Sequence, residues 1–211
     1  MSKFTDLETR VRTLLEDQDA RRFSTALLAA ALRRALDEID MQLPNISEWQ
    51  VTAAAADRDL ALTGLEGCRF IIDITIENRV LEPETGFTYF LKNGVPTLHF
   101  AGNDFPQAGE MLLVRFASGH TIEGFEGHET TTLPASFESA LVNGTAAEAC
   151  FLRAGSLAER YGTRPADPGR LVETGHLLRQ TFIRNLSALK AIQDFGFPPG
   201  FALDFWDRRH P

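Results

Sequence analysis

The chain has little cysteine, few large aromatic residues other than Phe, and no long hydrophobic run. Its 211 residues include two Cys, two Trp and two Tyr. Cys68 and Cys150 do not form a Cys-x-x-Cys pair, so we expect two reduced, buried thiols. Because there is no run of about 18 apolar residues, we expect no transmembrane helix. The first residues lack the apolar core of a signal peptide, which predicts a protein made and kept in the cytoplasm.

Positive charge is also scarce. The net charge is −8, and Lys and Arg gather only in short pairs such as Arg21-Arg22, Arg33-Arg34 and Arg208-Arg209. Tight binding of nucleic acid needs clustered cations that neutralise phosphates, so this class of function is disfavoured. An acidic surface instead suits nucleic acid that passes nearby without adhering, since like charges repel.

Motifs for catalysis or metal binding are missing as well. The five histidines do not form a His-x-x-x-His or His-Glu-x-x-His arrangement, so we expect no metal site. The chain has neither a Gly-x-Ser-x-Gly elbow nor a phosphate loop ending in Gly-Lys-Ser/Thr. A carboxylate pair for glycoside cleavage stays open, although Trp and Tyr are too few for a typical sugar-binding cleft. We therefore expect no catalytic residue, no cofactor and no enzyme.

Helical signals open the chain. Apolar residues at helical spacing predict a first helix over 5–19. Ser24 suits the N-cap of a second helix, and Pro44 ends that helix because the residue before a proline is pushed out of helical geometry. The pair predicts a helical hairpin.

The middle of the chain has the period of strands. Residues 69–77 are rich in β-branched side chains, and Asn93-Gly94 between two apolar runs is a strong hairpin signal. With 111–117 and two shorter candidates, Val51-Thr52 and Leu60 to Leu62, this predicts about four to six antiparallel strands between residues 50 and 125. The polar stretch from Gly124 to Thr132 is expected to be mobile.

Helices return near Pro134, which is tolerated in a first helical turn. The predicted helix to about residue 160 has an unusually thin centre around Gly144 and Ala147, where another helix can approach closely. That helix belongs either to the same chain or to a neighbouring subunit. A last helix from about 170 to 194 should pair with it in an antiparallel hairpin.

These elements predict an α+β fold. We expect a four-helix bundle with an antiparallel β-rich insert between helices two and three and an extended aromatic C-terminal tail. Residues 1–49 would form the N-terminal helical hairpin and 50–131 the insert. Residues 132–193 would form the second hairpin of the same bundle, and 194–211 the tail.

The tail is the most informative segment. It is rich in aromatics, and Pro198, Pro199 and Gly200 forbid a continuous helix. A disordered tail is normally poor in aromatics, so we expect this one to be extended and docked. Docking on its own domain and docking on another chain are both open: the first avoids exposed apolar side chains before assembly, and the second suits a terminal segment.

Three stretches together resemble the adaptor proteins (head–tail connector, or head-completion proteins) of tailed bacteriophages. The first is Leu7 to Pro44, with its Arg-Phe-Ser-Thr helix start and proline exit. The second is Thr130 to Ala154, with Thr-Thr-Thr-Leu-Pro before the small-residue helix. The third is the Pro-Gln-Ala-Gly turn at Pro106 to Gly109, which precedes a strand. The resemblance covers most of residues 7–193.

This resemblance implies a virion structural protein of the neck, made in the cytoplasm of the host bacterium. Such adaptors form a homo-oligomeric ring, typically of about twelve copies (a dodecamer), between the portal and the next tail component. Genomic DNA passes through the ring without sequence-specific binding, and no membrane is involved. The tip of the predicted hairpin, Lys92, Asn93 and Gly94, would contact the tail component. The residues that would contact the portal lie in the tail: Phe195, Phe197, Phe201, Phe205, Trp206, Arg208 and Arg209.

Two other classes of function stay open from the residues alone. One is a cytoplasmic interaction module or chaperone that uses the tail as a plug. The other is a small hydrolase, which would need a pocket with converging polar groups.

Overall fold

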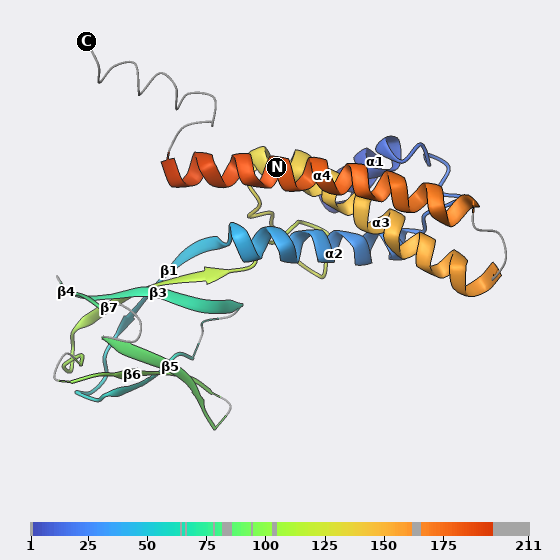
Figure 1. The fold of residues 1–211 in the computed structure, drawn as a ribbon. Coiled ribbons are helices and arrows are strands. Elements are labelled where there is room, and N and C mark those ends of the chain that lie inside the picture. Colours follow the sequence, from blue (N-terminus) through green and yellow to red (C-terminus); the bar gives the residue numbers. More distant parts are fainter. Residues whose placement is uncertain are drawn as a thin grey trace, which may run out of the picture. The chain divides into compact units, whose positions relative to one another are not determined.

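Two stretches of helix enclose a stretch of strands along the chain (Figure 1). A computed structural model describes residues 2–63, 65, 67–77, 79–81, 86–93, 95–102, 105–161 and 166–195. The chain divides into two units. Unit 1 comprises Met1–Leu43 and His120–Pro211, and unit 2 comprises Pro44–Gly119.

Helices α1 (Phe4–Leu14) and α2 (Thr25–Gln42) correspond to the first two predicted helices, but α1 ends at Leu14, before the predicted end at residue 19. The Ser24 side chain accepts a hydrogen bond from the backbone N–H of Leu27, which satisfies one of the free donors at the start of α2. One face of α2, from Leu28 to Ile39, is buried in the core of unit 1.

The second helical pair consists of α3 (Glu138–Tyr161), preceded by the short 3₁₀ helix η1 (Ala135–Phe137), and α4 (Ala166–Phe195). Helix α3 packs against α1, α2 and α4. The expected four-helix bundle is wrong, because the helices gather around α3 instead of forming a four-sided bundle, and the sheets of unit 2 make up the rest of a mixed α+β fold. Small side chains let α3 accept neighbours on several sides.

Gly144 marks the closest approach within unit 1. A Cβ atom there would lie 3.0 Å from the ring of Phe182 on α4 and 3.1 Å from the Cβ of Ala35 on α2. Ala147, one turn further along α3, is fully buried. Gly144 therefore lets α2 and α4 contact α3 at the same level. A second close contact joins Gly175 on α4 to Phe151 on α3, where a Cβ would lie 2.7 Å from the ring.

An ion-pair network holds the same three helices together nearer the surface. Arg179 on α4 lies 2.6 Å from Glu38 on α2 and 3.2 Å from Glu148 on α3. Arg34 on α2 also approaches Glu148, at 3.6 Å. Because both carboxylates are more than two-thirds buried, this network is worth more than a solvated surface pair.

Unit 2 contains two antiparallel sheets. Sheet A has the strand order β1-β7-β3-β4, and sheet B has the order β2-β6-β5. The strands are β1 (Asn45–Thr52), β2 (Asp59–Ala61), β3 (Cys68–Ile76), β4 (Arg79–Leu81), β5 (Phe87–Lys92), β6 (Val95–Phe100) and β7 (Met111–Ser118). Strand β1 begins at Asn45, earlier than the short strand expected at Val51.

Both sheets contribute to one hydrophobic core in unit 2. Ile74 and Val114 come from sheet A, and Phe87, Leu98 and Phe100 come from sheet B. All five side chains are almost fully buried. The alternation of side-chain direction along each strand places these residues on the face of their sheet that packs in this core.

The stretch that was expected to be mobile, Gly124 to Thr132, is a compact loop that packs on the N-terminus. The backbone N–H of Gly124 donates to the carbonyl of His128 at 2.9 Å, and the Phe125 ring is buried 5.3 Å from that of Phe4. The backbone N–H of Phe4 donates to the carbonyl of Glu123 at 3.0 Å. The stretch is mostly polar, but the ring of Phe125 within it is buried, and this contact orders the loop.

The chain leaves unit 1 and returns to it at adjacent points. The His120 imidazole donates from Nε2 to the carbonyl oxygen of Leu43 at 3.0 Å, and the His120 backbone N–H donates to the buried Asp40 carboxylate at 2.9 Å. In unit 2, the first and last paired residues, Asn45 and Ser118, lie opposite each other. The two chain segments that connect the units therefore lie next to each other in unit 1, at Leu43 and His120, and again in unit 2, at Asn45 and Ser118.

We predict that Gly144→Leu lowers the free energy of unfolding by about 2 kcal/mol or more, because no space exists for its side chain between α2 and α4. Thermal unfolding followed by circular dichroism measures the loss. Gly155→Ala is the matched control on α3. No atom lies within 4 Å of the Cβ position there, so the alanine should stabilise the chain by up to about 1 kcal/mol through helix propensity. Equal effects at both glycines would contradict the close approach.

Candidate functional site

The tip of the β5–β6 hairpin is one predicted contact site. Lys92 lies at the end of β5, and Asn93 takes the left-handed backbone conformation of the turn, with φ of 54°. Gly94 lies outside the described residues. The Lys92 ammonium is 2.5 Å from the Asp59 carboxylate of β2, whose other oxygen accepts a hydrogen bond from His99 Nδ1 at 2.7 Å.

This arrangement braces the hairpin across all three strands of sheet B. Hydrogen bonds from Lys92 and then from His99 lower the pKa of Asp59. Beside the charged group, Phe90 and Val95 are more than a third exposed. The hairpin tip thus presents two apolar side chains next to a fixed set of charges, a combination that suits contact with another protein.

The aromatic tail is the second predicted site. Helix α4 extends to Phe195, so the backbone of Phe195 is helical instead of belonging to an extended tail. The other residues assigned to the portal contact lie outside the described residues: Phe197, Phe201, Phe205, Trp206, Arg208 and Arg209. Of the positions predicted for close helix packing, Gly144 and Ala147 both lie inside unit 1 on α3.

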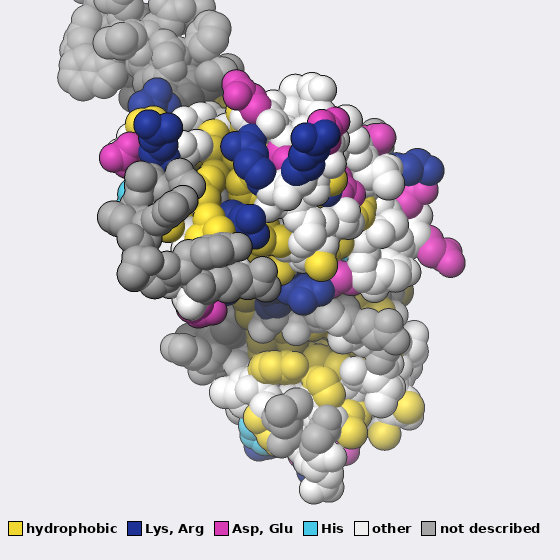
Figure 2. Space-filling view, turned by 90° about the vertical axis from the view of Figure 1, so that its right-hand side faces the viewer, with side chains coloured by type: hydrophobic (Ala, Val, Ile, Leu, Met, Phe, Trp, Pro, Cys, Tyr) yellow, Lys and Arg dark blue, Asp and Glu magenta, His cyan; other side chains and the backbone are white. Residues whose placement is uncertain are grey.

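Exposed hydrophobic side chains occur in more than one place on the molecule, as Figure 2 shows for one face. On α4, Leu177 is 67% exposed and Ile183 is 47% exposed. On the outer face of sheet A, Phe70 and Met111 are more than half exposed. Scattered apolar residues are normal on a protein surface, so these positions are not by themselves a site.

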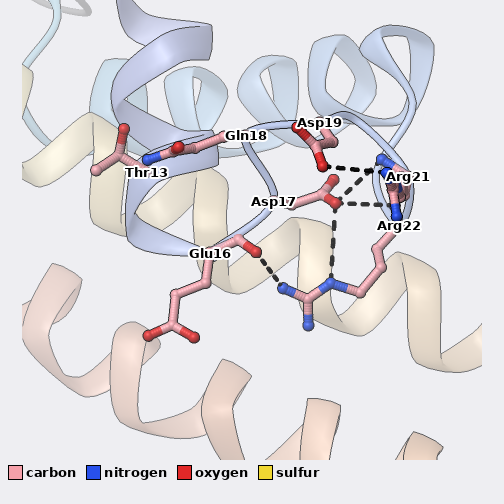
Figure 3. Close-up of a pocket in the computed structure, with 7 residues that line it drawn as sticks. All are labelled: Thr13, Glu16, Asp17, Gln18, Asp19, Arg21 and Arg22. Atoms are coloured by element: carbon pink, nitrogen blue, oxygen red, sulfur yellow. Dashed lines mark hydrogen bonds and ion pairs between the residues drawn. The ribbon is translucent and has the colours of Figure 1, made fainter.

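A polar hollow of about 460 Å³ lies at the turn between α1 and α2 (Figure 3). Asp17 occupies its centre and accepts hydrogen bonds from the backbone N–H groups of Arg21, Arg22 and Phe23, at 3.1, 3.0 and 2.8 Å. The Arg22 guanidinium donates to two carbonyl oxygens at the end of α1. The residues that line the hollow are Thr13, Glu16, Asp17, Gln18, Asp19, Arg21 and Arg22.

The polar groups of this hollow largely satisfy one another. Burial favours the neutral form of Asp17, but hydrogen bonds from the backbone of Arg22, Phe23 and Arg21 outweigh it and lower the pKa of the carboxyl. Asp17 therefore stays ionised as the brace of the turn. The sequence pattern predicts only that the first helix ends at Asp17-Gln18-Asp19. The signal for a brace is an Asp followed by Arg-Arg-Phe just before a helix start.

The two thiols differ in burial. Cys150 on α3 is fully buried, and burial raises the pKa of its thiol to about 11, although the charge of Arg22 acts the other way. Cys68 at the start of β3 is partly buried, and burial raises its pKa as well. Neither thiol is activated as a nucleophile, since a reactive cysteine needs a lowered pKa.

Within the described part of the chain, no group of three or more His, Cys, Asp or Glu side chains is placed to hold a metal ion. In the same residues, no helix is both long and apolar enough to cross a membrane.

Replacing the brace of the turn should destabilise the chain in a pH-dependent way. We predict that Asp17→Asn lowers the free energy of unfolding by about 2 kcal/mol at neutral pH. Because the folded pKa of Asp17 is lowered, its contribution is fully present above the unfolded pKa of about 3.9 and is lost as pH falls through the folded value. Urea unfolding of both proteins at a series of pH values from neutral down to about 2 gives the difference.

Asp19→Asn is the matched control for this substitution. Asp19 is 73% exposed and pairs with the exposed Arg21, so its loss should change stability by less than about 0.5 kcal/mol. A difference between Asp17→Asn and the unmodified chain that persists undiminished at the lowest pH would contradict the ionised brace.

The thiols provide a separate test of burial. In the native chain at pH 8 we expect a disulfide reagent such as DTNB to modify Cys68 first and Cys150 only on unfolding. The reason is that less than about 1% of the Cys150 thiol is ionised at this pH. Absorbance of the released chromophore measures both rates. In Cys68→Ser the native reaction should almost disappear; a rapid reaction in that variant would show that Cys150 is accessible.

Comparisons with known proteins give few matches. No protein-family model matches the chain, and no curated protein matches it. One similar solved structure is described as "Neck of empty GTA particle computed with C6 symmetry". The likeness covers 82% of this chain and 87% of that chain, with 14% sequence identity and a TM-score of 0.29.

Proposed function

We propose that the chain is a structural head–tail adaptor of a phage-like virion. It forms a ring beneath the portal protein, joins capsid to tail at the virion neck, and leaves a channel for DNA. One observation carries the proposal: the order of helical hairpin, inserted β unit, small-residue helix α3 and aromatic terminal segment, with the motifs that resemble adaptor proteins. The role is architectural, without catalysis or a cofactor.

The terminal segment supplies the portal contact in this proposal. The 16 residues 196–211 follow α4 and contain four large aromatic side chains and two Arg, which are favoured anchors in interface cores. A weak contact made by each segment becomes strong when many copies act together around a ring. The segment reaches about 50 Å when extended, enough to cross to another subunit.

The charge of the chain suits the channel. A net charge of −8 repels phosphates, so DNA slides past the ring instead of adhering to it. The β5–β6 hairpin tip, Lys92 to Gly94, is the contact for the next tail component in this proposal, because the ion pair between Lys92 and Asp59 ties the end of β5 to β2.

The test is a deletion of residues 196–211, combined with the portal protein of the same genome. The deletion removes none of the core described for unit 1, so its circular dichroism and thermal midpoint should match those of the full chain. Mass photometry of the full chain with the portal should give a stoichiometric complex, and the truncated chain should bind at least about tenfold more weakly.

A full-length chain with the same terminal residues in shuffled order is the matched control, since it keeps composition and charge. It should bind as weakly as the truncated chain. Normal portal binding by the truncated chain, or a failure of that chain to fold, would overturn the assignment of the terminal segment.

A further inference from the structure

In the part of unit 2 that the structure describes, the two sheets leave four edge strands, and these differ in length. Sheet A ends in β1 and β4, and sheet B ends in β2 and β5. Strands β2 and β4 have three residues each, whereas β1 has eight and β5 has six. Proteins protect edges by keeping them short or by placing Pro, Lys or a bulge there. One long edge therefore remains in each sheet.

Strand β1 is protected by neither Pro, Lys nor a bulge, although Glu48 gives it one charged side chain. Its eight residues, Asn45 to Thr52, contain no Pro, Lys or Gly, and they pair with β7 without a register shift. Within the described residues, β7 is the only strand that pairs with β1. A long, regular, unprotected edge is a template for another strand, and natural proteins keep such an edge when it has a partner.

Strand β5 is the corresponding edge of sheet B. It pairs with β6 through Phe87 to Lys92, and it has no other partner strand in the part of the chain that the structure describes. Thr88, Phe90 and Lys92 lie on one face of β5, and Lys92 places one protective charge at its end. On the other face Tyr89 is also exposed, at 39%, whereas Phe87 is buried in the core.

The two edges are complementary in charge. In β1 the exposed face carries Glu48, Gln50 and Thr52, and the side chains between them are partly buried. An antiparallel register with Glu48 opposite Lys92 also sets Gln50 opposite Phe90, so that both exposed faces lie on one side. The opposite charges of Glu48 and Lys92 favour this register over its neighbours.

The matching groups are available for such a pair. Arg115, the neighbour of Glu48 on β7, is engaged at 2.9 Å by Asp73 on β3. Lys92 holds Asp59 on its own sheet but has three N–H donors, so it can contact a second carboxylate.

We propose that copies of this chain associate head to tail, with β1 of one copy added as an antiparallel strand to β5 of the next. The inference rests on the proposed function, because it assigns the contact between subunits of the ring. A head-to-tail contact uses two different surfaces of each copy and closes into a ring when the rotation fits. The partner of each edge is a second copy of this chain, because both complementary edge strands belong to one chain. A strand from a different protein would leave one of the two edges unpaired.

A charge swap tests the contact. Glu48→Lys and Lys92→Glu should each weaken self-association by at least about tenfold, and the chain with both changes should recover to within about threefold of the unmodified protein. Light scattering and mass photometry over a range of concentrations, with and without the portal, give the oligomer distribution.

Two matched controls separate the contact from local damage. Asp59→Asn breaks the same internal pair as Lys92→Glu but should leave association unchanged. Thr75→Lys adds a charge on the outer face of sheet A in the central strand β3, away from either long edge, and should also have no effect.

Cross-linking identifies the residues directly. A carbodiimide that joins carboxylates to amines should link Glu48 to Lys92 in a mixture of ¹⁵N-labelled and unlabelled chains, and the linked peptides should include hybrids of the two isotopes. The internal Asp59–Lys92 link, which should form only within one copy, is the reference.

Three results decide between the contact and the function. If neither Glu48→Lys nor Lys92→Glu weakens the oligomer and no hybrid Glu48–Lys92 link forms, the strand contact is overturned. Formation of a portal complex in that case leaves the adaptor function standing. Association through the two edges without portal binding supports the contact and overturns the function. A chain that stays monomeric at every concentration, with and without the portal, overturns both.

Discussion

The helical unit depends on the absence of a side chain at one point of α3. At Gly144 the ring of Phe182 and the methyl of Ala35 approach the same backbone position, so α2 and α4 meet α3 at one level. This proximity also brings Arg179 within reach of carboxylates on both other helices. Had α3 carried a large residue there, the helices would spread apart, and both the buried contact and the ion-pair network would be lost together.

Local signals in the sequence predicted local structure well. Ser24 and Pro44 bound α2 as expected, and Asn93-Gly94 marks the hairpin between β5 and β6. The arrangement of the helices was not predictable in the same way, because an apolar stripe shows that a helix is buried but not which helix lies at the centre. Only the last two residues of strand β1, Val51 and Thr52, were predicted as a strand, because the alternation over its whole length, Asn-Ile-Ser-Glu-Trp-Gln-Val-Thr, is weakly apolar and is stabilised by pairing with the distant β7.

The candidate site shows the same division between local and distant partners. Lys92 could be placed at a hairpin tip from its neighbours in sequence, but its ion pair with Asp59 joins residues 33 positions apart. The turn brace at Asp17 likewise depends on backbone N–H groups whose direction only the folded loop determines. The order of motifs in the sequence predicted a class of protein. The candidate contact surfaces, the edge strands β1 and β5, could be identified only from the strand order and strand lengths of the folded sheets.

The hydrogen bond from His120 to Leu43 has a consequence for how such a chain can change over time. The chain leaves unit 1 after Leu43 and re-enters it at His120, and these two residues are in contact. Unit 2 is therefore inserted at a single point of the helical core. A short turn could span that point if the 76 residues Pro44–Gly119 were absent. Unit 2 is thus an inserted domain that can be lengthened, shortened or exchanged for another domain while the hydrophobic core described for unit 1 is kept.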